Sequence, residues 1–120
     1  MNDIIKKTLE LENQEYYEKH LQVINAVLPE QMTPKEIEVL ASFMALEGEM
    51  AEEDRFGTYC RKKVKSLKNL SNGGLANYIR ILKEKGFIKV GENGEYEIPF
   101  FLFPQPTAQQ YEFKIVNKEK

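Results

Sequence analysis

The side chains most able to do chemistry in this sequence are the cationic ones between Tyr59 and Lys89. This segment holds nine basic residues against the single acidic residue Glu84, a charge of 9 − 1 = +8, whereas the remaining sequence carries 8 − 18 = −10. Lysine and arginine at this density can neutralise the phosphates of a nucleic acid. The alternative is that they only solvate two exposed helix faces, as charge runs commonly do. The nine residues are Arg61, Lys62, Lys63, Lys65, Lys68, Arg80, Lys83, Lys85 and Lys89.

Catalysis and metal binding find little support in the residue types. Cys60 is the only cysteine and His20 is the only histidine. A single cysteine excludes an intramolecular disulfide and a zinc cluster. We expect Cys60 to lie on a helix with its thiol packed in the protein interior. His20 has no recognisable partners for nucleophilic catalysis. We therefore expect no catalytic residue, no metal, no cofactor and no small-molecule substrate.

The composition is that of an ordinary globular domain. Of the 120 residues, 42% are hydrophobic and 30% are charged, which is typical of one soluble domain. No apolar run approaches the roughly 20 residues that cross a bilayer. Asp3 and Glu10 interrupt the apolar residues near the N-terminus, so this end does not resemble a secretory signal. We expect a cytoplasmic protein with no membrane partner.

A capped helix and a β-hairpin are predicted to position half of the basic segment. Ser71 is a preferred helix N-cap residue, and Gly86 fits the left-handed position that ends a helix. Strands are predicted at 87–90 and 95–98, joined by a turn at 91–94, because the Asn-Gly pair in that turn tolerates positive φ. The apolar stripe of the helix consists of Leu75, Tyr78, Ile79 and Leu82.

Two helices are predicted in the N-terminal half. The first covers about 14–27, with Asn13 as its cap, and its apolar stripe includes Tyr17 and Leu21. This stripe could pack on the core or contact a second copy of the chain. The second helix begins at Pro34, because the preceding Thr33 and the following Glu36 form a capping box.

A third helix, over 59–67 with Thr58 as its cap, is predicted to carry four of the basic residues. The segment before it, 47–55, is acidic and lacks regular apolar spacing, so we predict a loop. The expected inward-facing residues here are Phe56, Tyr59, Val64 and Leu67.

The C-terminal segment 99–106 is rich in phenylalanine and bounded by prolines. It is too apolar to lie free in solvent, and its prolines exclude a central strand. We expect it to wrap over its own domain or to bury itself in a partner. Residues 111–116 alternate between apolar and polar, which predicts a strand. This strand could extend the hairpin sheet or join a neighbouring subunit.

The order of these elements resembles the winged helix-turn-helix superfamily, and in particular small winged-helix proteins of tailed phages and bacteria. The resemblance to the superfamily lies in Leu70-Ser71, in Leu75, Ile79 and Leu82, and in Lys85-Gly86-Phe87-Ile88, where a recognition helix runs into a wing strand. The resemblance to the phage proteins covers about 30–116: a helix that opens with Thr-Pro-Lys-Glu, a basic helix, a helix start rich in Ser, Asn and Gly, and an apolar C-terminal arm bounded by prolines. It implies an α+β fold with a three-helix core and a β-hairpin wing at 32–98. An N-terminal segment and helix (1–31) and a C-terminal arm ending in a strand (99–120) would flank this domain.

The resemblance implies a non-enzymatic, double-stranded DNA-binding protein, for example a small phage or bacterial transcriptional regulator. Its third helix would enter the major groove and its wing would contact the backbone. Side chains of the basic helix would hold phosphates, and Asn77 and Arg80 could reach base edges. The expected nucleic-acid-binding residues are Arg61, Lys62, Lys65, Lys68, Asn72, Gly73, Asn77, Arg80, Lys83, Lys89 and Asn93.

The alternative function is that of a structural or assembly protein of a phage particle, such as a ring, connector or adaptor subunit. In that case the domain is a scaffold for protein contacts, and the protein belongs to the virion rather than to the host cytoplasm. Either function is compatible with a homo-oligomer or a partner protein bound through the C-terminal arm. The expected contact residues are Tyr17, Leu21, Phe100, Phe101 and Phe103.

Overall fold

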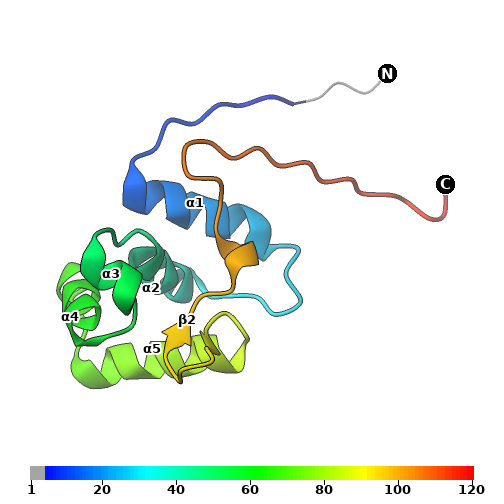
Figure 1. The fold of residues 1–120 in the computed structure, drawn as a ribbon. Helices are drawn as coiled ribbons and strands as arrows, with labels where there is room; N and C mark the ends of the chain where they lie inside the picture. The colour runs from blue at the N-terminus through cyan, green and yellow to red at the C-terminus, as the bar shows by residue number, and fades with distance from the viewer. Residues whose placement is uncertain (1–4) are drawn as a thin grey trace.

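The computed structural model describes residues 5–120, so the first four residues of the expected N-terminal segment lie outside it. The described residues form an α+β fold that is mostly helical, as predicted, with one small antiparallel sheet (Figure 1). The elements in chain order are α1 (Asn13–Asn25), α2 (Pro34–Met44), α3 (Glu49–Glu53), α4 (Thr58–Leu67), α5 (Asn72–Glu84), β1 (Lys89–Val90), β2 (Tyr96–Glu97) and a 3-10 helix, η1 (Phe100–Leu102).

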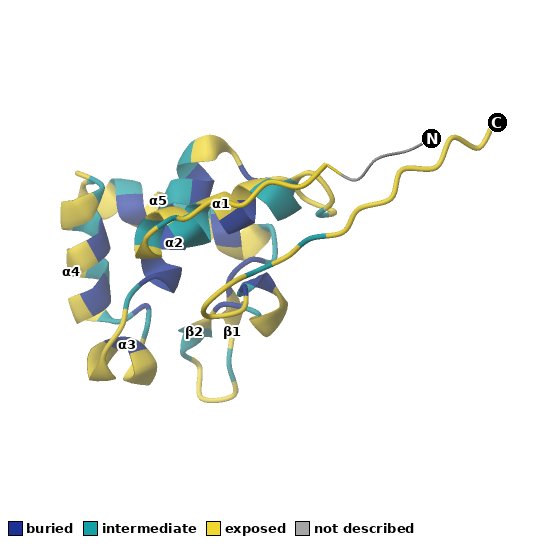
Figure 2. Cartoon of the chain, turned by 90° about the horizontal axis from the view of Figure 1, so that it is seen from above, coloured by how far each residue is buried: buried dark blue, intermediate teal, exposed yellow. Residues whose placement is uncertain are grey.

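Helix α2 forms the centre of the core and packs against α1, α4 and α5. Figure 2 shows it buried along most of its length. The predicted capping box is confirmed, since the Thr33 hydroxyl accepts from the Glu36 N–H at 3.3 Å and the Glu36 carboxylate accepts from the Thr33 N–H at 3.1 Å. These bonds satisfy backbone N–H groups at the helix start that have no partner within the helix.

Helix α1 forms where predicted, but Asn13 is not its cap. The cap position is Glu12, which makes no side-chain capping bond. The amide of Asn13 instead donates to the Ala45 carbonyl at 3.3 Å and ties α1 to the end of α2. The helix ends at Asn25, whose amide bonds both backbone groups of Met32 at 2.7 and 3.0 Å. This tertiary bond closes the loop to α2 and explains the earlier end.

The predicted loop at 47–55 is wrong, because Glu49–Glu53 form the short helix α3. The helix follows Gly48, whose φ of +102° only glycine adopts readily. Its single buried residue is Ala51. One small buried side chain leaves no apolar periodicity to read, so the sequence pattern did not reveal this helix.

Helix α4 buries a narrower face than predicted. Cys60 and Val64 are buried one turn apart, and burial raises the pKa of the Cys60 thiol. Tyr59 and Leu67 were predicted to face inward, but 50% and 67% of their surfaces are exposed. The predicted cap is also wrong, because Gly57 occupies the N-cap position. Phe56 is buried as expected.

Helix α5 and its ends confirm the sequence prediction. The Ser71 hydroxyl accepts from the Gly74 N–H at 2.9 Å. Gly86 has φ +87°, its N–H donates to the Lys83 carbonyl at 3.1 Å, and the Phe87 N–H donates to the Leu82 carbonyl at 2.8 Å. These two bonds form a Schellman motif. Leu75, Ile79 and Leu82 are buried.

The hairpin forms at the predicted place with shorter strands. Lys89 pairs with Glu97 and Val90 pairs with Tyr96. Phe87 and Ile88 were predicted to belong to the first strand, but both are buried and both donate their N–H groups to the Leu82 carbonyl. The helix end therefore takes the backbone bonds that a longer strand would need.

The C-terminal arm packs partly on its own domain. Leu102 and Pro104 are buried and Phe103 packs against the core, whereas Phe100 and Phe101 are 92% and 64% exposed. The predicted strand at 111–116 is absent from the described residues, and this segment does not join the hairpin sheet. Figures 1 and 2 show the described residues before α1 and the C-terminal segment running out on the same side of the molecule.

His20 holds the arm to α1. Its Nε2 lies 2.8 Å from the Leu102 carbonyl and its Nδ1 lies 2.5 Å from the Tyr111 hydroxyl. Because a carbonyl only accepts, Nε2 carries the proton and Nδ1 accepts from Tyr111. Burial lowers the pKa of His20 below its ordinary 6.5, although the bond to Leu102 favours the charged form. Burial also raises the pKa of Tyr111 to about 12.

We expect the protein to lose stability in mild acid. A lowered histidine pKa stabilises the folded state fully above the unfolded pKa of 6.5, and this contribution is lost as pH falls below that value. Between about pH 7.5 and about pH 5.5, above the usual titration range of carboxylates, the free energy of unfolding should fall by up to about 1 kcal/mol. Urea titrations of the wild type and His20→Gln measure this change. An equal pH dependence in the variant would show that His20 is not the cause.

A second prediction concerns the buried ion pair between α5 and the start of α2. Lys85 Nζ lies 2.7 Å from Glu36 Oε1 and 2.7 Å from the Gln31 carbonyl. Burial alone would raise the pKa of Glu36, but the Lys85 and Thr33 hydrogen bonds outweigh it and lower this pKa. Replacing Lys85 by methionine leaves a buried carboxylate without its cation and should cost about 1 to 3 kcal/mol. Lys62→Met, at an exposed position, is the control and should change stability by less than about 0.5 kcal/mol.

Candidate nucleic-acid interface

The exposed face of α5 carries the polar side chains that the sequence assigned to a groove. Helical spacing turns Leu75, Ile79 and Leu82 into the core and leaves the opposite stripe in solvent. Its residues are Asn72, Gly73, Ala76, Asn77, Arg80 and Lys83, all exposed. Small residues at the start of the stripe and long polar ones further along suit close approach to a groove.

Residues Arg80 and Asn77 lie together on this face. Arg80 donates to the Asn77 side-chain oxygen at 2.7 Å and forms an exposed ion pair with Glu84 at 2.8 Å. An exposed pair four residues apart on a helix is worth about 0.3 to 0.5 kcal/mol. The guanidinium can therefore leave Glu84 for a base or a phosphate at little cost.

Helix α4 meets this face at the start of α5. Lys65 donates to the side-chain oxygen of Asn72, the first residue of α5. Lys62 lies one turn earlier on α4 and is exposed. The contact brings the Lys65 side chain of α4 beside the polar stripe of α5.

The glycine pair at the start of α5 is open on one side. A Cβ at Gly73 would meet no atom within 4 Å, and one at Gly74 would meet only the Ser71 hydroxyl, at 3.1 Å. Packing within the described domain therefore does not account for Gly73. An external surface approaching the helix backbone remains a physical reason for a residue that weakens a helix.

Two other basic residues that the sequence analysis assigned to nucleic-acid binding, Arg61 on α4 and Lys68 just after it, make contacts within the domain. Lys68 lies 3.7 Å from Glu38 of α2. Arg61 donates to the Phe56 carbonyl at 2.5 Å and lies 5.9 Å from the ring centre of Tyr96. These side chains fix α4 to its neighbours, so they are poorly placed to hold phosphates.

The hairpin is a poor phosphate contact for an electrostatic reason. Lys89 lies directly opposite Glu97 in the sheet, and Glu92 and Glu95 lie in the connecting turn. The hairpin therefore carries three carboxylates against one lysine. Asn93 is exposed in this turn, but its surroundings are acidic.

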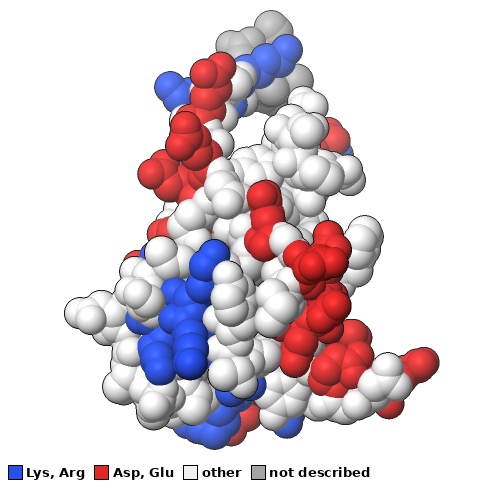
Figure 3. Space-filling model, turned by 60° about the vertical axis from the view of Figure 1, so that its left-hand side comes forward, with Lys and Arg blue, Asp and Glu red and all other residues white. Residues whose placement is uncertain are grey.

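Acidic residues also cluster on α3, which packs against α4. Figure 3 shows the resulting contrast, with a group of basic side chains on one part of the surface and a band of acidic side chains on another. This separation restricts any contact with a polyanion to part of the molecule.

Two residues with structural roles were missed by sequence reasoning. Arg55 donates to the carbonyls of Phe43, Met44 and Leu46 at 2.7, 3.3 and 3.1 Å, and lies 5.6 Å from the Phe103 ring centre. Burial lowers its pKa. The other is His20, described above. Both residues contact groups outside their own helix or turn, so a local sequence pattern does not predict these contacts.

Three of the expected partner-contact residues belong to the core of the monomer instead. Leu21 is completely buried, and Tyr17 and Phe103 are partly buried against the core. Leu21 therefore has no surface to offer to a partner. Phe100 and Phe101 remain available.

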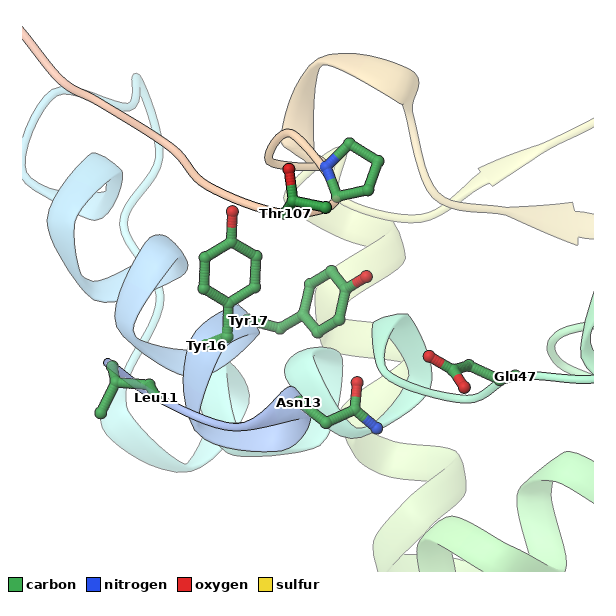
Figure 4. A pocket seen from close by; sticks show the side chains of 7 residues that line it. Leu11, Asn13, Tyr16, Tyr17, Glu47 and Thr107 are labelled. Carbon is green, nitrogen blue, oxygen red and sulfur yellow. The ribbon is translucent and has the colours of Figure 1, made fainter. Parts of the chain in front are cut away.

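A shallow pocket of about 370 Å³ lies between the start of α1 and the C-terminal arm (Figure 4). Its walls include Tyr16, Tyr17, Asn13 and Glu47. The Tyr16 hydroxyl is already engaged, since it donates to the Gln105 carbonyl at 2.5 Å. This lining provides no nucleophile paired with a base.

Within residues 5–120, no group of three or more His, Cys, Asp or Glu side chains could hold a metal ion. Each helix in the same range is too short or too polar to cross a membrane. Comparisons with family models, with curated proteins and with solved structures found no match to this chain.

The glycines of α5 give a test of stability. Gly73→Ala adds a methyl group in open space in a helix and should stabilise the protein by up to about 1 kcal/mol. Gly86→Ala is the matched comparison, because its φ of +87° strains any side chain and should destabilise by about 1 kcal/mol. Thermal unfolding measures both. A destabilised Gly73→Ala would mean that the start of α5 is packed more tightly than described here.

Proposed function

We propose that this chain is a winged-helix DNA-binding protein of the size of a small transcriptional regulator. The helices α2, α4 and α5 would form the three-helix core and β1–β2 the wing, in the order that this fold requires. Helix α5 would enter the major groove, with Asn77 and Arg80 toward base edges, and α4 would lie along the backbone.

One observation supports this proposal most: the contact of Lys65 with Asn72 joins the basic side of α4 to the open polar face of α5. In such a surface the cations can bind phosphates, and the small residues at the start of the neighbouring helix allow that helix to approach a groove closely. The wing has no part in the proposed contact, because its carboxylates would face phosphates. The lysines of α4 and α5 that form no ion pair within the described domain are Lys62, Lys63, Lys65 and Lys83. Lys65 has donors beyond its bond to Asn72, and Lys83 Nζ lies over the Tyr96 ring at 4.9 Å but is exposed.

The exposed Phe100 and Phe101 favour a second candidate function, that of an assembly subunit. Exposed apolar patches mark sites of protein contact. In that case the domain would act as a scaffold, and its binding partner would be another protein of the particle.

Binding of the full chain to random duplex DNA over a salt series tests the proposal. Four phosphate contacts predict a slope of log K against log salt of about −3.6. The double variant Lys62→Ala/Lys65→Ala should reduce the magnitude of the slope by about 2. Lys19→Ala removes an exposed cation from α1 and is the matched control, for which we expect no comparable effect.

Absence of binding at low salt would contradict the proposal and favour the assembly function. Equal weakening by Lys19→Ala and by the α4 variant would show only non-specific attraction. Asn77→Ala should leave the slope unchanged, because an amide neutralises no phosphate.

A further inference from the structure

The C-terminal segment 111–116 is an extended strand-like arm without a strand partner among the described residues. The rings of Tyr111 and Phe113 stack at 6.3 Å between centres with planes 8° apart, so alternate residues share one face. Phe113 and Ile115 on this face are 52% and 97% exposed. Glu112 and Lys114 occupy the opposite face.

The segment that leads into 111–116 is held to α1 at two points. The Gln105 carbonyl accepts from Tyr16 at 2.5 Å, and Tyr111 bonds His20 at 2.5 Å with their rings stacked. Beyond Tyr111, the described residues make no hydrogen bond between the arm and the domain. The backbone donors and acceptors of 112–116 are therefore unpaired among the described residues, and such a segment is a template for another strand.

We propose that this arm pairs with the same arm of a second copy of the chain, in an antiparallel ribbon centred on Phe113. In this register Phe113 faces its own copy and Tyr111 faces Ile115. Glu112 of each copy then lies opposite Lys114 of the other. The pairing is self-complementary, as a two-fold interface requires.

Other registers of the ribbon are less stable, because they bring like charges, or apolar and charged side chains, opposite one another. Centring the ribbon on Glu112 opposes two carboxylates, and centring it on Lys114 opposes two ammonium groups, both of which are destabilising. A one-residue slip places apolar side chains opposite charged ones. The charge order of 112–114 therefore selects one register and identifies a copy of the chain as the partner.

An isolated two-stranded ribbon is only marginally stable. The N-terminal arm runs out on the same side of the molecule, as Figures 1 and 2 show, and carries the exposed residues Ile5 and Leu9. These side chains add apolar surface on that side. The dimer is therefore a weak, concentration-dependent one, and it does not depend on the proposed DNA binding.

Sedimentation equilibrium of the full chain, with charge-reversal variants, tests the pairing. Glu112→Lys and Lys114→Glu each place two like charges opposite one another and should weaken the dimer about tenfold. The double variant Glu112→Lys/Lys114→Glu should restore it. An equimolar mixture of the two single variants should associate as well as the wild type, because opposite charges then face each other.

Both positions are exposed, so each variant should keep the wild-type unfolding temperature. A chain that stays monomeric at every concentration would overturn the proposal. So would a dimer that the single variants do not weaken, or one that neither the double variant nor the mixture restores.

Discussion

Burial of helix α2 on nearly every side is the constraint on which the rest of the structure depends. The terminal N–H and C=O groups of a helix have no partner within it, and in α2 side chains from other parts of the chain bond several of them. Thr33 and Glu36 satisfy the start of α2, and Lys85 from the end of α5 neutralises the Glu36 carboxylate. At the other end, Arg55 takes carbonyls of Phe43 and Met44, and Asn13 takes that of Ala45. Elements distant in the sequence are thus joined at the two ends of one helix.

Bonds within the domain also decide which basic side chains remain free at the surface. Lys85, Arg55, Arg61 and Lys68 all bond groups within the domain, so they are not free for a polyanion. Exposed cations of the basic segment remain on α4 and on the outer face of α5, whereas α3 and the β1–β2 hairpin are acidic. A chain with a net charge of −2 can therefore offer a cationic surface, but only over part of its area.

The C-terminal arm shows how one buried polar group can position a long exposed segment. His20 bonds the arm through both ring nitrogens, at Leu102 and at Tyr111. A neutral imidazole with one donor and one acceptor fits these two partners without a charge. The residues beyond Tyr111 make no hydrogen bond to the rest of the described domain, and charged and apolar side chains alternate along 112–115.

The sequence by itself determined the features that depend on neighbouring residues. The capping box at Thr33, the Ser71 cap, the Gly86 stop and the stripe of Leu75, Ile79 and Leu82 all follow from spacings within a few positions. The charge of the 59–89 segment was equally visible. Only the tertiary structure decided that the side chains of Arg61 and Lys68 bond groups within the domain. It also decided that α3 forms around the single buried residue Ala51, although its sequence shows no apolar periodicity. Finally, 111–116 pairs with no strand among the described residues. These outcomes depend on which groups meet across long sequence separations, and a local pattern holds no information about that geometry.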